Sequence, residues 1–327
     1  MSRRSRISRA PRTAARIAVL TLTASALATG PAIAAGTTAG ATAGTDGGAK
    51  PTVVLVHGAF ADASGWSGVV ERLQHHGYKV VAPANPLRSL SGDSTYIASV
   101  LKSIEGPIVL AGHSYGGAVI TEAAAGNPNV KALVYVSAFM PDKGETLGAL
   151  SAKFTGSELQ PALKPVPYTD GTTTGQDLYI RDDKFHSVFG ADLARAETKV
   201  MAVEQRPIAA ACFEEKATKA AWRSIPSWFV VSKHDKAIAP DLERFEARRA
   251  KSHTVELNSS HVSMMSHPDV VTRLIREAAT ATAGDRRAEL ARTGAQAQAL
   301  VGVGGLAGAA LLAGTALVMT GRRHSRD

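Results

Sequence analysis

The sequence contains very little cysteine. Cys212 is the single cysteine among 327 residues, so the chain cannot form an internal disulfide. No motif surrounds Cys212, and we interpret it as a buried structural thiol. Metal-binding spacings such as CxxC and HExxH are also missing. The sequence therefore predicts no metal site.

Charged residues are scarce as well, at 20% of the sequence, which excludes a highly charged disordered chain. The formal net charge of +9 would by itself suggest a nucleic-acid partner. However, six arginines lie within residues 1–34, and three more lie within residues 294–327 against one aspartate. The part between these ends keeps a net charge of +1. We therefore expect no nucleic-acid partner.

The first 34 residues have the pattern of a cleaved export signal. The arginines precede an uncharged stretch from Ile17 to Thr29, which is too short to span a bilayer as a helix. A small-residue cleavage site of the A-x-A type follows at residues 32–34. The pair Arg3-Arg4 favours twin-arginine export, but Arg6 stands where that signal usually has an apolar residue. Sec and Tat export both stay open.

The C-terminal end combines three elements in a fixed order. The pentapeptide Leu290-Ala291-Arg292-Thr293-Gly294 precedes an uncharged run from Ala299 to Thr320, and a basic tail follows. The uncharged run is long enough to span a membrane, and the basic tail would stay in the cytoplasm. This order resembles the LAxTG-type cell-wall sorting signal of actinobacteria, in which a sortase joins the threonine to peptidoglycan. The resemblance implies an exported, cell-wall-attached protein; a permanent membrane anchor formed by residues 294–327 is the alternative.

Between two linkers, predicted at residues 35–50 and 279–293, the chain alternates short apolar runs with helical patterns. Helical spacing occurs over residues 66–76, 96–104 and 117–125. Continuous apolar runs are typical of strands in a parallel sheet that is covered on both faces. These runs are residues 52–56, 79–82, 107–111, 132–136 and 228–231. The alternation predicts, for residues 51–278, an α/β fold with a mostly parallel, doubly wound sheet.

Residues 141–226 interrupt this alternation. They lie between two predicted strands and are far more numerous than a plain crossover needs. They also contain seven of the 17 aromatic residues. We interpret this segment as a cap inserted over the end of the sheet. Its aromatic side chains line a pocket or pack the cap's own core.

Gly112-His113-Ser114-Tyr115-Gly116 lies between a predicted strand and a predicted helix. A G-x-S-x-G sequence in this position is typical of a nucleophile elbow, a sharp turn that exposes the serine hydroxyl. A serine hydroxyl is a poor nucleophile until a base accepts its proton. Ser114 is therefore the candidate nucleophile.

The base is expected later in the chain, because folds with a G-x-S-x-G elbow carry their catalytic residues in the order Ser, Asp, His. His261 follows a predicted strand at residues 254–257 and precedes a helix, so we expect it on a loop that faces the elbow. His253 opens that strand, and His267 directly precedes Pro268 at the helix start. His261 is the predicted base.

The orienting acid is expected on a loop after the strand at residues 228–231. Asp235 has this position, where it would hold the imidazole tautomer and stabilise the imidazolium. Asp142 is the runner-up, because it follows the strand that ends near Ser137.

An oxyanion hole needs two backbone N–H groups directed at the developing charge. We expect one from Tyr115, the residue after the nucleophile. The second is expected from the turn His57-Gly58-Ala59-Phe60, with Ala59 as the first choice and Phe60 as the second. We interpret His57 as a residue that fixes this loop.

These motifs, together with Asn85-Pro86-Leu87-Arg88 and the pattern around His261, resemble the α/β-hydrolase superfamily over residues 51–278. Within it the sequence is similar to bacterial lid-bearing esterases, among them pyrethroid-hydrolysing carboxylesterases, and to plant methylesterases and hydroxynitrile lyases. The resemblance implies no cofactor. Val262 stands where the lyases carry a lysine, which argues against that activity.

The sequence thus predicts a serine hydrolase that cleaves small carboxylic esters through an acyl-enzyme. Two alternatives stay open. One is a cofactor-free perhydrolase of the haloperoxidase type, which uses the same triad. The other is a non-catalytic surface protein that binds a ligand with a hydrolase fold.

Overall fold

The computed structural model describes residues 50–282. The predicted export signal, the predicted linker up to residue 49, and the predicted sorting motif Leu290-Ala291-Arg292-Thr293-Gly294 with its hydrophobic segment lie outside the described residues. Residues 268–282 are helical, so this helix extends beyond the boundary that the sequence predicts at residue 278. Ala278 and Ala279 are buried, which explains why the helix continues.

A six-stranded sheet forms the centre of the fold, with strand order β2-β1-β3-β4-β8-β9. All five pairings among these strands are parallel. The strands are β1 (Thr52–Val56), β2 (Val80–Val81), β3 (Ile108–His113), β4 (Val130–Val136), β8 (Ser227–Ser232) and β9 (His253–Leu257). Every residue of β1, β3 and β8 is buried, as the continuous apolar runs predict. The predicted α/β-hydrolase fold is confirmed.

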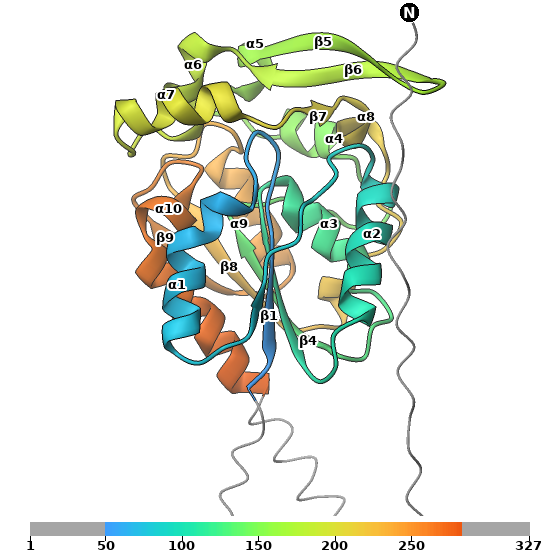
Figure 1. Ribbon diagram of the computed structural model, residues 1–327, viewed down its shortest axis with the longest axis vertical. Helices are drawn as coiled ribbons and strands as arrows, with labels where there is room; N and C mark the ends of the chain where they lie inside the picture. The colour runs from blue at the N-terminus through green and yellow to red at the C-terminus, as the bar shows by residue number, and fades with distance from the viewer. Residues whose placement is uncertain (1–49, 283–327) are drawn as a thin grey trace, which may run out of the picture. The chain divides into compact units, whose positions relative to one another are not determined.

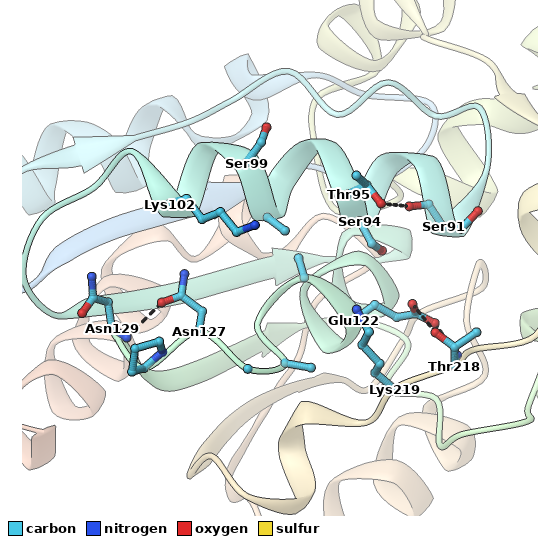
Figure 2. A pocket seen from close by; sticks show the side chains of 15 residues that line it. Ser91, Ser94, Thr95, Ser99, Lys102, Glu122, Asn127, Asn129, Thr218 and Lys219 are labelled. Atoms are coloured by element: carbon cyan, nitrogen blue, oxygen red, sulfur yellow. Dashed lines mark hydrogen bonds between the residues drawn. The ribbon is translucent and has the colours of Figure 1, made fainter.

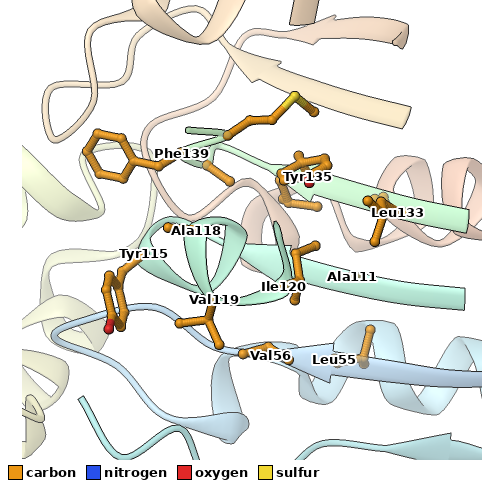
Figure 3. Close-up of a cluster of buried hydrophobic side chains, with 14 of the residues drawn as sticks. Leu55, Val56, Ala111, Tyr115, Ala118, Val119, Ile120, Leu133, Tyr135 and Phe139 are labelled. Atoms are coloured by element: carbon orange, nitrogen blue, oxygen red, sulfur yellow. The ribbon is translucent and has the colours of Figure 1, made fainter. Parts of the chain in front are cut away.

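Helices cover both faces of this sheet. They are η1 (Ala63–Trp66), α1 (Ser67–His75), α2 (Leu90–Lys102), α3 (Tyr115–Ala123), α9 (Pro240–Arg249) and α10 (Ser263–Ser266). Figure 1 shows α1 and the helical residues 268–282 on one side of the sheet, with α2 and α3 on the other. Apolar side chains of β1, β3 and β4 pack against α3 to form the core that Figure 3 shows in part.

The chain between β4 and β8 forms the inserted cap. It contains α4 (Leu147–Ala152), α5 (Leu159–Ala162), α6 (Asp182–Phe189), α7 (Arg195–Glu204), α8 (Ala211–Glu214) and η2 (Ala221–Arg223). Three short antiparallel strands form a second sheet: β5 (Leu163–Asp170), β6 (Thr173–Ile180) and β7 (Ile208–Ala209). In Figure 1 this cap lies over one end of the central sheet.

Candidate active site

Ser114 occupies a sharp turn between β3, which ends at His113, and α3, which begins at Tyr115. Its φ of 54° lies in the left-handed region, a strained conformation for a residue with a side chain. The turn requires one glycine within it and one in the neighbouring loop after β1. A Cβ on Gly116 would lie 2.5 Å from a backbone oxygen of β1, and a Cβ on Gly58 would lie 2.6 Å from the Ser114 Cβ. The sequence therefore builds a nucleophile elbow here.

A continuous chain of hydrogen bonds begins at this serine. The Ser114 hydroxyl oxygen lies 2.8 Å from His261 Nε2, and His261 Nδ1 lies 2.6 Å from Asp235 Oδ2. Asp235 Oδ1 accepts hydrogen bonds from the backbone N–H groups of Ala237 and Ile238, at 2.7 and 2.9 Å. A carboxylate held in this way directs the Nδ1–H of the imidazole toward itself, which leaves Nε2 free to accept the serine proton.

The loops that carry these residues are joined by buried serine hydroxyls. Ser137, after β4, bonds to Ser232 at the end of β8 at 2.7 Å and to Ser263 of α10 at 2.9 Å. All three serines are fully buried. Satisfied polar networks of this kind rigidify their surroundings, so the network fixes the Asp235 and His261 loops relative to each other.

His113, within the elbow, contacts the base directly. Its Nε2–H donates to the backbone oxygen of His261 at 3.1 Å, and the two rings lie 4.7 Å apart between centroids. Burial holds the pKa of His113 well below its usual range, so the ring is neutral and adds no charge to the site. This contact was not predicted from the sequence. The available signal was a second histidine inside the elbow motif.

The backbone donors near Ser114 differ in availability. The N–H of Phe60 donates to the Arg206 oxygen of the cap at 2.9 Å. For Ala59, no backbone acceptor is found within residues 50–282. Tyr115 is the first residue of α3, and the N–H of a first helical residue has no acceptor within the helix. Ala59 and Tyr115 therefore keep the two free N–H groups, whereas Phe60 does not.

His57 lies behind this turn. Its Nε2 accepts the backbone N–H of Asn85 at 2.8 Å, so the ring proton sits on Nδ1, which donates to the Gly58 oxygen at 2.9 Å. The Asn85 side chain donates in turn to the His57 backbone oxygen at 3.0 Å. Burial lowers the pKa of His57. The ring is neutral and holds the loop in place.

Asp142, the runner-up acid, lies elsewhere. It pairs with Arg223 through two hydrogen bonds, one of them 2.9 Å long between Nε and Oδ1. The Arg223 guanidinium lowers the pKa of Asp142. Because His261 Nδ1 is already bound by Asp235, Asp142 takes no part in the chain of hydrogen bonds that starts at Ser114.

Aromatic side chains of the cap cover the site. The Phe189 ring of α6 lies 5.2 Å from the His261 ring and 5.0 Å from Phe185. Ser114 is only 7% exposed as a result. A cavity of about 50 Å³ opens beside this cluster, lined by Phe60, Met201 of α7 and other side chains. Ser114 and His261 are not among the residues that line this cavity.

A larger groove of about 710 Å³ lies between α2 and the end of α3 (Figure 2). Ser114, His261 and Asp235 are not among its lining residues. Several of its hydroxyl groups are already bonded; Thr95, for example, donates to the backbone oxygen of Ser91 in the same helix at 2.8 Å. This groove is separate from the candidate active site.

Residues 50–282 contain neither a metal-binding cluster nor a helix that could span a membrane. No cluster of three or more His, Cys, Asp or Glu side chains has the arrangement of a metal site in this part of the chain. No helix within the same residues is long and apolar enough to cross a membrane. Cys212 is buried, and burial raises the pKa of its thiol to about 12.

The model of the alpha/beta hydrolase family matches residues 53–274, which is most of the chain. The chain belongs to this family. An alpha/beta hydrolase, nvfD, of Aspergillus novofumigatus is 26% identical to it over 70% of the chain and 97% of its own length. A carbendazim-hydrolysing esterase of a Nocardioides species is 37% identical over 31% of this chain and 47% of its own length.

Solved structures show the same fold for this hydrolase. Polyneuridine aldehyde esterase superposes with a TM-score of 0.62 at 20% identity, covering 70% of this chain and 99% of its own. A pyrethroid hydrolase of Sphingobium faniae superposes with a TM-score of 0.58 at 22% identity, covering 71% of this chain and 98% of its own. The esterase and hydrolase names of these relatives support the predicted ester hydrolase.

Proposed function

We propose that this hydrolase cleaves small carboxylic esters with Ser114 as nucleophile, His261 as base and Asp235 as orienting acid. The observation that carries the proposal is the continuous chain of hydrogen bonds from the serine hydroxyl through the imidazole to the buried carboxylate. The two distances, 2.8 and 2.6 Å, are within the range required for proton transfer from a nucleophile to its base.

In the first half of the reaction the Ser114 hydroxyl oxygen attacks the ester carbonyl carbon, and its proton moves to His261 Nε2. Asp235 stabilises the imidazolium that forms. The backbone N–H groups of Ala59 and Tyr115 stabilise the oxyanion, each contributing about 3–4 kcal/mol. The tetrahedral intermediate then collapses, and the ester C–O bond breaks. His261 gives its proton to the leaving alcohol.

In the second half, water attacks the acyl-enzyme carbonyl. His261 accepts a proton from this water, and the same two N–H groups stabilise the second oxyanion. The intermediate releases the carboxylic acid, and the Ser114 oxygen regains its proton from His261. Ser114 and His261 thus return to their starting protonation states. The proposed reaction uses no cofactor.

The cap supports a preference for small substrates. The Phe189 ring lies 5.2 Å from the His261 ring, and Ser114 is only 7% exposed, so the aromatic side chains of the cap leave little room for a long acyl chain. We therefore propose acyl groups of about two to four carbons as substrates.

Ser114→Ala tests this function. The variant should lose p-nitrophenyl acetate turnover and keep a melting temperature close to that of the wild type, since the change removes a single hydroxyl group and leaves the backbone of the turn in place. Undiminished turnover would refute the assignment. A p-nitrophenyl ester series from C2 to C12 tests the substrate size. A maximum at C2 to C4 supports small esters, and a maximum at C12 indicates a lipase.

We also propose that the protein is exported and attached to the cell wall by cleavage between Thr293 and Gly294. The export pattern and the order of the C-terminal elements support this proposal. Cell fractionation tests it. Thr293→Ala should move the protein from the wall to the membrane fraction, whereas an unchanged distribution would contradict sortase attachment.

A further inference from the structure

A second acid lies behind Asp235 and has no role in the reaction described above. Glu243 belongs to α9, which packs against β8. Its side chain is fully buried, and its Oε2 accepts the backbone N–H of Ser232 at 2.8 Å. Asp235 bonds to the same residue, because its backbone N–H donates to the Ser232 oxygen at 3.1 Å, so the two acids meet at one turn, where the charge of Asp235 acts on the Glu243 carboxyl group. Two interacting carboxyl groups in the interior cannot both be ionised without a large cost in free energy.

The hydrogen-bond partners decide which of the two keeps the proton. Asp235 accepts from two backbone N–H groups and from His261, and these donors stabilise its ionised form. Glu243 accepts from one backbone N–H, and its Oε1 is buried without a donor. No basic side chain within residues 50–282 forms a salt bridge with Glu243. The proton therefore belongs on Glu243.

We propose that Glu243 is a positioning residue, a carboxylic acid that keeps its proton at neutral pH and donates it in a hydrogen bond to Asp235. In this arrangement Asp235 carries a single negative charge that is shared between two side-chain donors, His261 on one side and Glu243 on the other. Glu243 thereby moderates the basicity of Asp235 and, through it, of His261. This inference rests on the proposed function of the triad.

The other ionisable groups around the pair leave this charge distribution intact. Burial raises the pKa of Glu246, the next buried acid of α9, to about 8, and Arg249 lies 3.8 Å from it. His113 is neutral, as described above. Lys236, adjacent to Asp235 in the chain, pairs with Glu158 at the surface. Burial and the Asp235 charge both raise the pKa of Glu243, in agreement with the geometric argument.

Two substitutions separate a neutral Glu243 from an ionised one. Glu243→Gln keeps the shape, an acceptor for the Ser232 N–H and a donor for Asp235. Glu243→Met keeps an unbranched side chain of similar size but removes the donor. When Asp235 loses this donor it becomes more basic and stabilises the imidazolium of His261 more strongly, so the pKa of His261 rises.

The measurement is the pH dependence of kcat/KM for p-nitrophenyl acetate in the full chain, since its acidic limb reports the base of the free enzyme. For Glu243→Gln we expect kcat/KM within about threefold of wild type and an unmoved acidic limb. For Glu243→Met we expect the limb to shift upward by about half a pH unit or more. If the Met variant does not fold, Glu243→Leu replaces it, because leucine also lacks a hydrogen-bond donor.

Two outcomes would overturn the proposal. A downward shift of the limb in Glu243→Gln would mean that the substitution had removed a negative charge, so that Glu243 was ionised. An unmoved limb in the folded Met or Leu variant would mean a purely structural role. Labelling of the wild type with a fluorophosphonate, and its loss in Ser114→Ala, is measured in parallel. Without Ser114-dependent labelling the proposed function itself fails, which is a different result from either limb outcome.

Discussion

The central sheet and the cap are built differently. At the end of the sheet, Ser114, His261 and Asp235 are buried and held by hydrogen bonds of 2.6 to 2.9 Å. In the cap, β5 alternates between exposed and half-buried residues, and α7 carries Val203, which is 80% exposed. This contrast suggests that the sheet positions the reacting groups, whereas the cap determines which molecules reach them.

Two backbone hydrogen bonds in the seam between the two regions involve cap residues 206–209. Arg206 of the cap accepts the N–H of Phe60, and the N–H of Ala209 donates to the oxygen of Leu87 at 3.0 Å. Phe60 and Leu87 both have positive φ angles, of 61° and 62°. The core loops thus accept backbone strain at the two points where they bond to cap residues 206–209. Substitutions beyond this seam should leave the chemistry intact.

The largest expected effect is in the sheet. Asp235→Asn keeps the shape of the side chain but removes the charge that orients His261, so kcat for p-nitrophenyl acetate should fall by about 10³ to 10⁴-fold. Steady-state kinetics on the purified variant gives the value. Asp142→Asn is the matched control, because that acid pairs with Arg223, and it should change kcat by less than about threefold. Equal losses in both variants would contradict the assignment.

The second prediction concerns a buried acid of the sheet region. The pKa of Glu246 is raised by burial to about 8. Below about pH 4.5 the carboxyl is protonated in both the folded and the unfolded chain. Between about pH 4.5 and 8 only the unfolded chain loses the proton, so the free energy of unfolding falls by about 1.4 kcal/mol per pH unit.

Glu246→Gln cannot ionise and escapes this loss. The variant should be more stable than wild type by about 3–5 kcal/mol at pH 8 and by less than about 1 kcal/mol at pH 5. Urea unfolding at the two pH values measures the difference. If the variant gained as much stability at pH 5 as at pH 8, the gain would come from the packing of the new side chain and not from the loss of an ionisable group.

The third prediction probes the cap. Phe189→Ala removes the ring that lies 5.2 Å from His261, which enlarges the space over the site. Relative kcat/KM for p-nitrophenyl octanoate over acetate should rise by about 10 to 100-fold, since one large side chain in a pocket changes discrimination by about 1–3 kcal/mol. Turnover of acetate should change much less. If acetate turnover collapsed instead, Phe189 would belong to the catalytic apparatus.

The smallest effect is expected at the seam. Arg88 forms an ion pair with Asp177 of β6 at 2.8 Å, and its side chain is 37% exposed. The Asp177 side chain is only 14% exposed, but solvent reaches the pair on the Arg88 side, so we place its contribution within the range of surface pairs, about 1 kcal/mol or less. Arg88→Ala should therefore lower the free energy of unfolding by less than about 1 kcal/mol, as measured in urea, and leave kcat for acetate unchanged. A large loss of stability would show that the cap and sheet fold as one tightly coupled unit.

The same contrast explains what the sequence predicts well. The strands of the sheet are fully buried, so their apolar runs mark them clearly; residues 52–56 agree with β1 at both ends. Helix α2 begins at Leu90, six residues before the predicted start at residue 96. Ser89 caps it by accepting the N–H of Gly92 at 3.1 Å, and the serine and glycine residues of the first turn conceal the apolar pattern.

The cap is harder to predict. Its strand β5 is mostly exposed, β6 is largely half-buried, and Pro165 and Pro167 within β5 argue against a strand in a sequence pattern. Contacts between distant residues are also invisible in one sequence. His113 bonds to a residue 148 positions later, and Glu243 is one of several acids in a helix whose buried face becomes known only in the fold.

The most direct test of the account is mass spectrometry of the protein after treatment with a fluorophosphonate, which reacts readily only with an activated serine. We predict one adduct per chain, on the peptide that contains Ser114, and its loss in His261→Ala. The absence of an adduct, or an adduct on another serine, would contradict the assignment of Ser114 as the nucleophile.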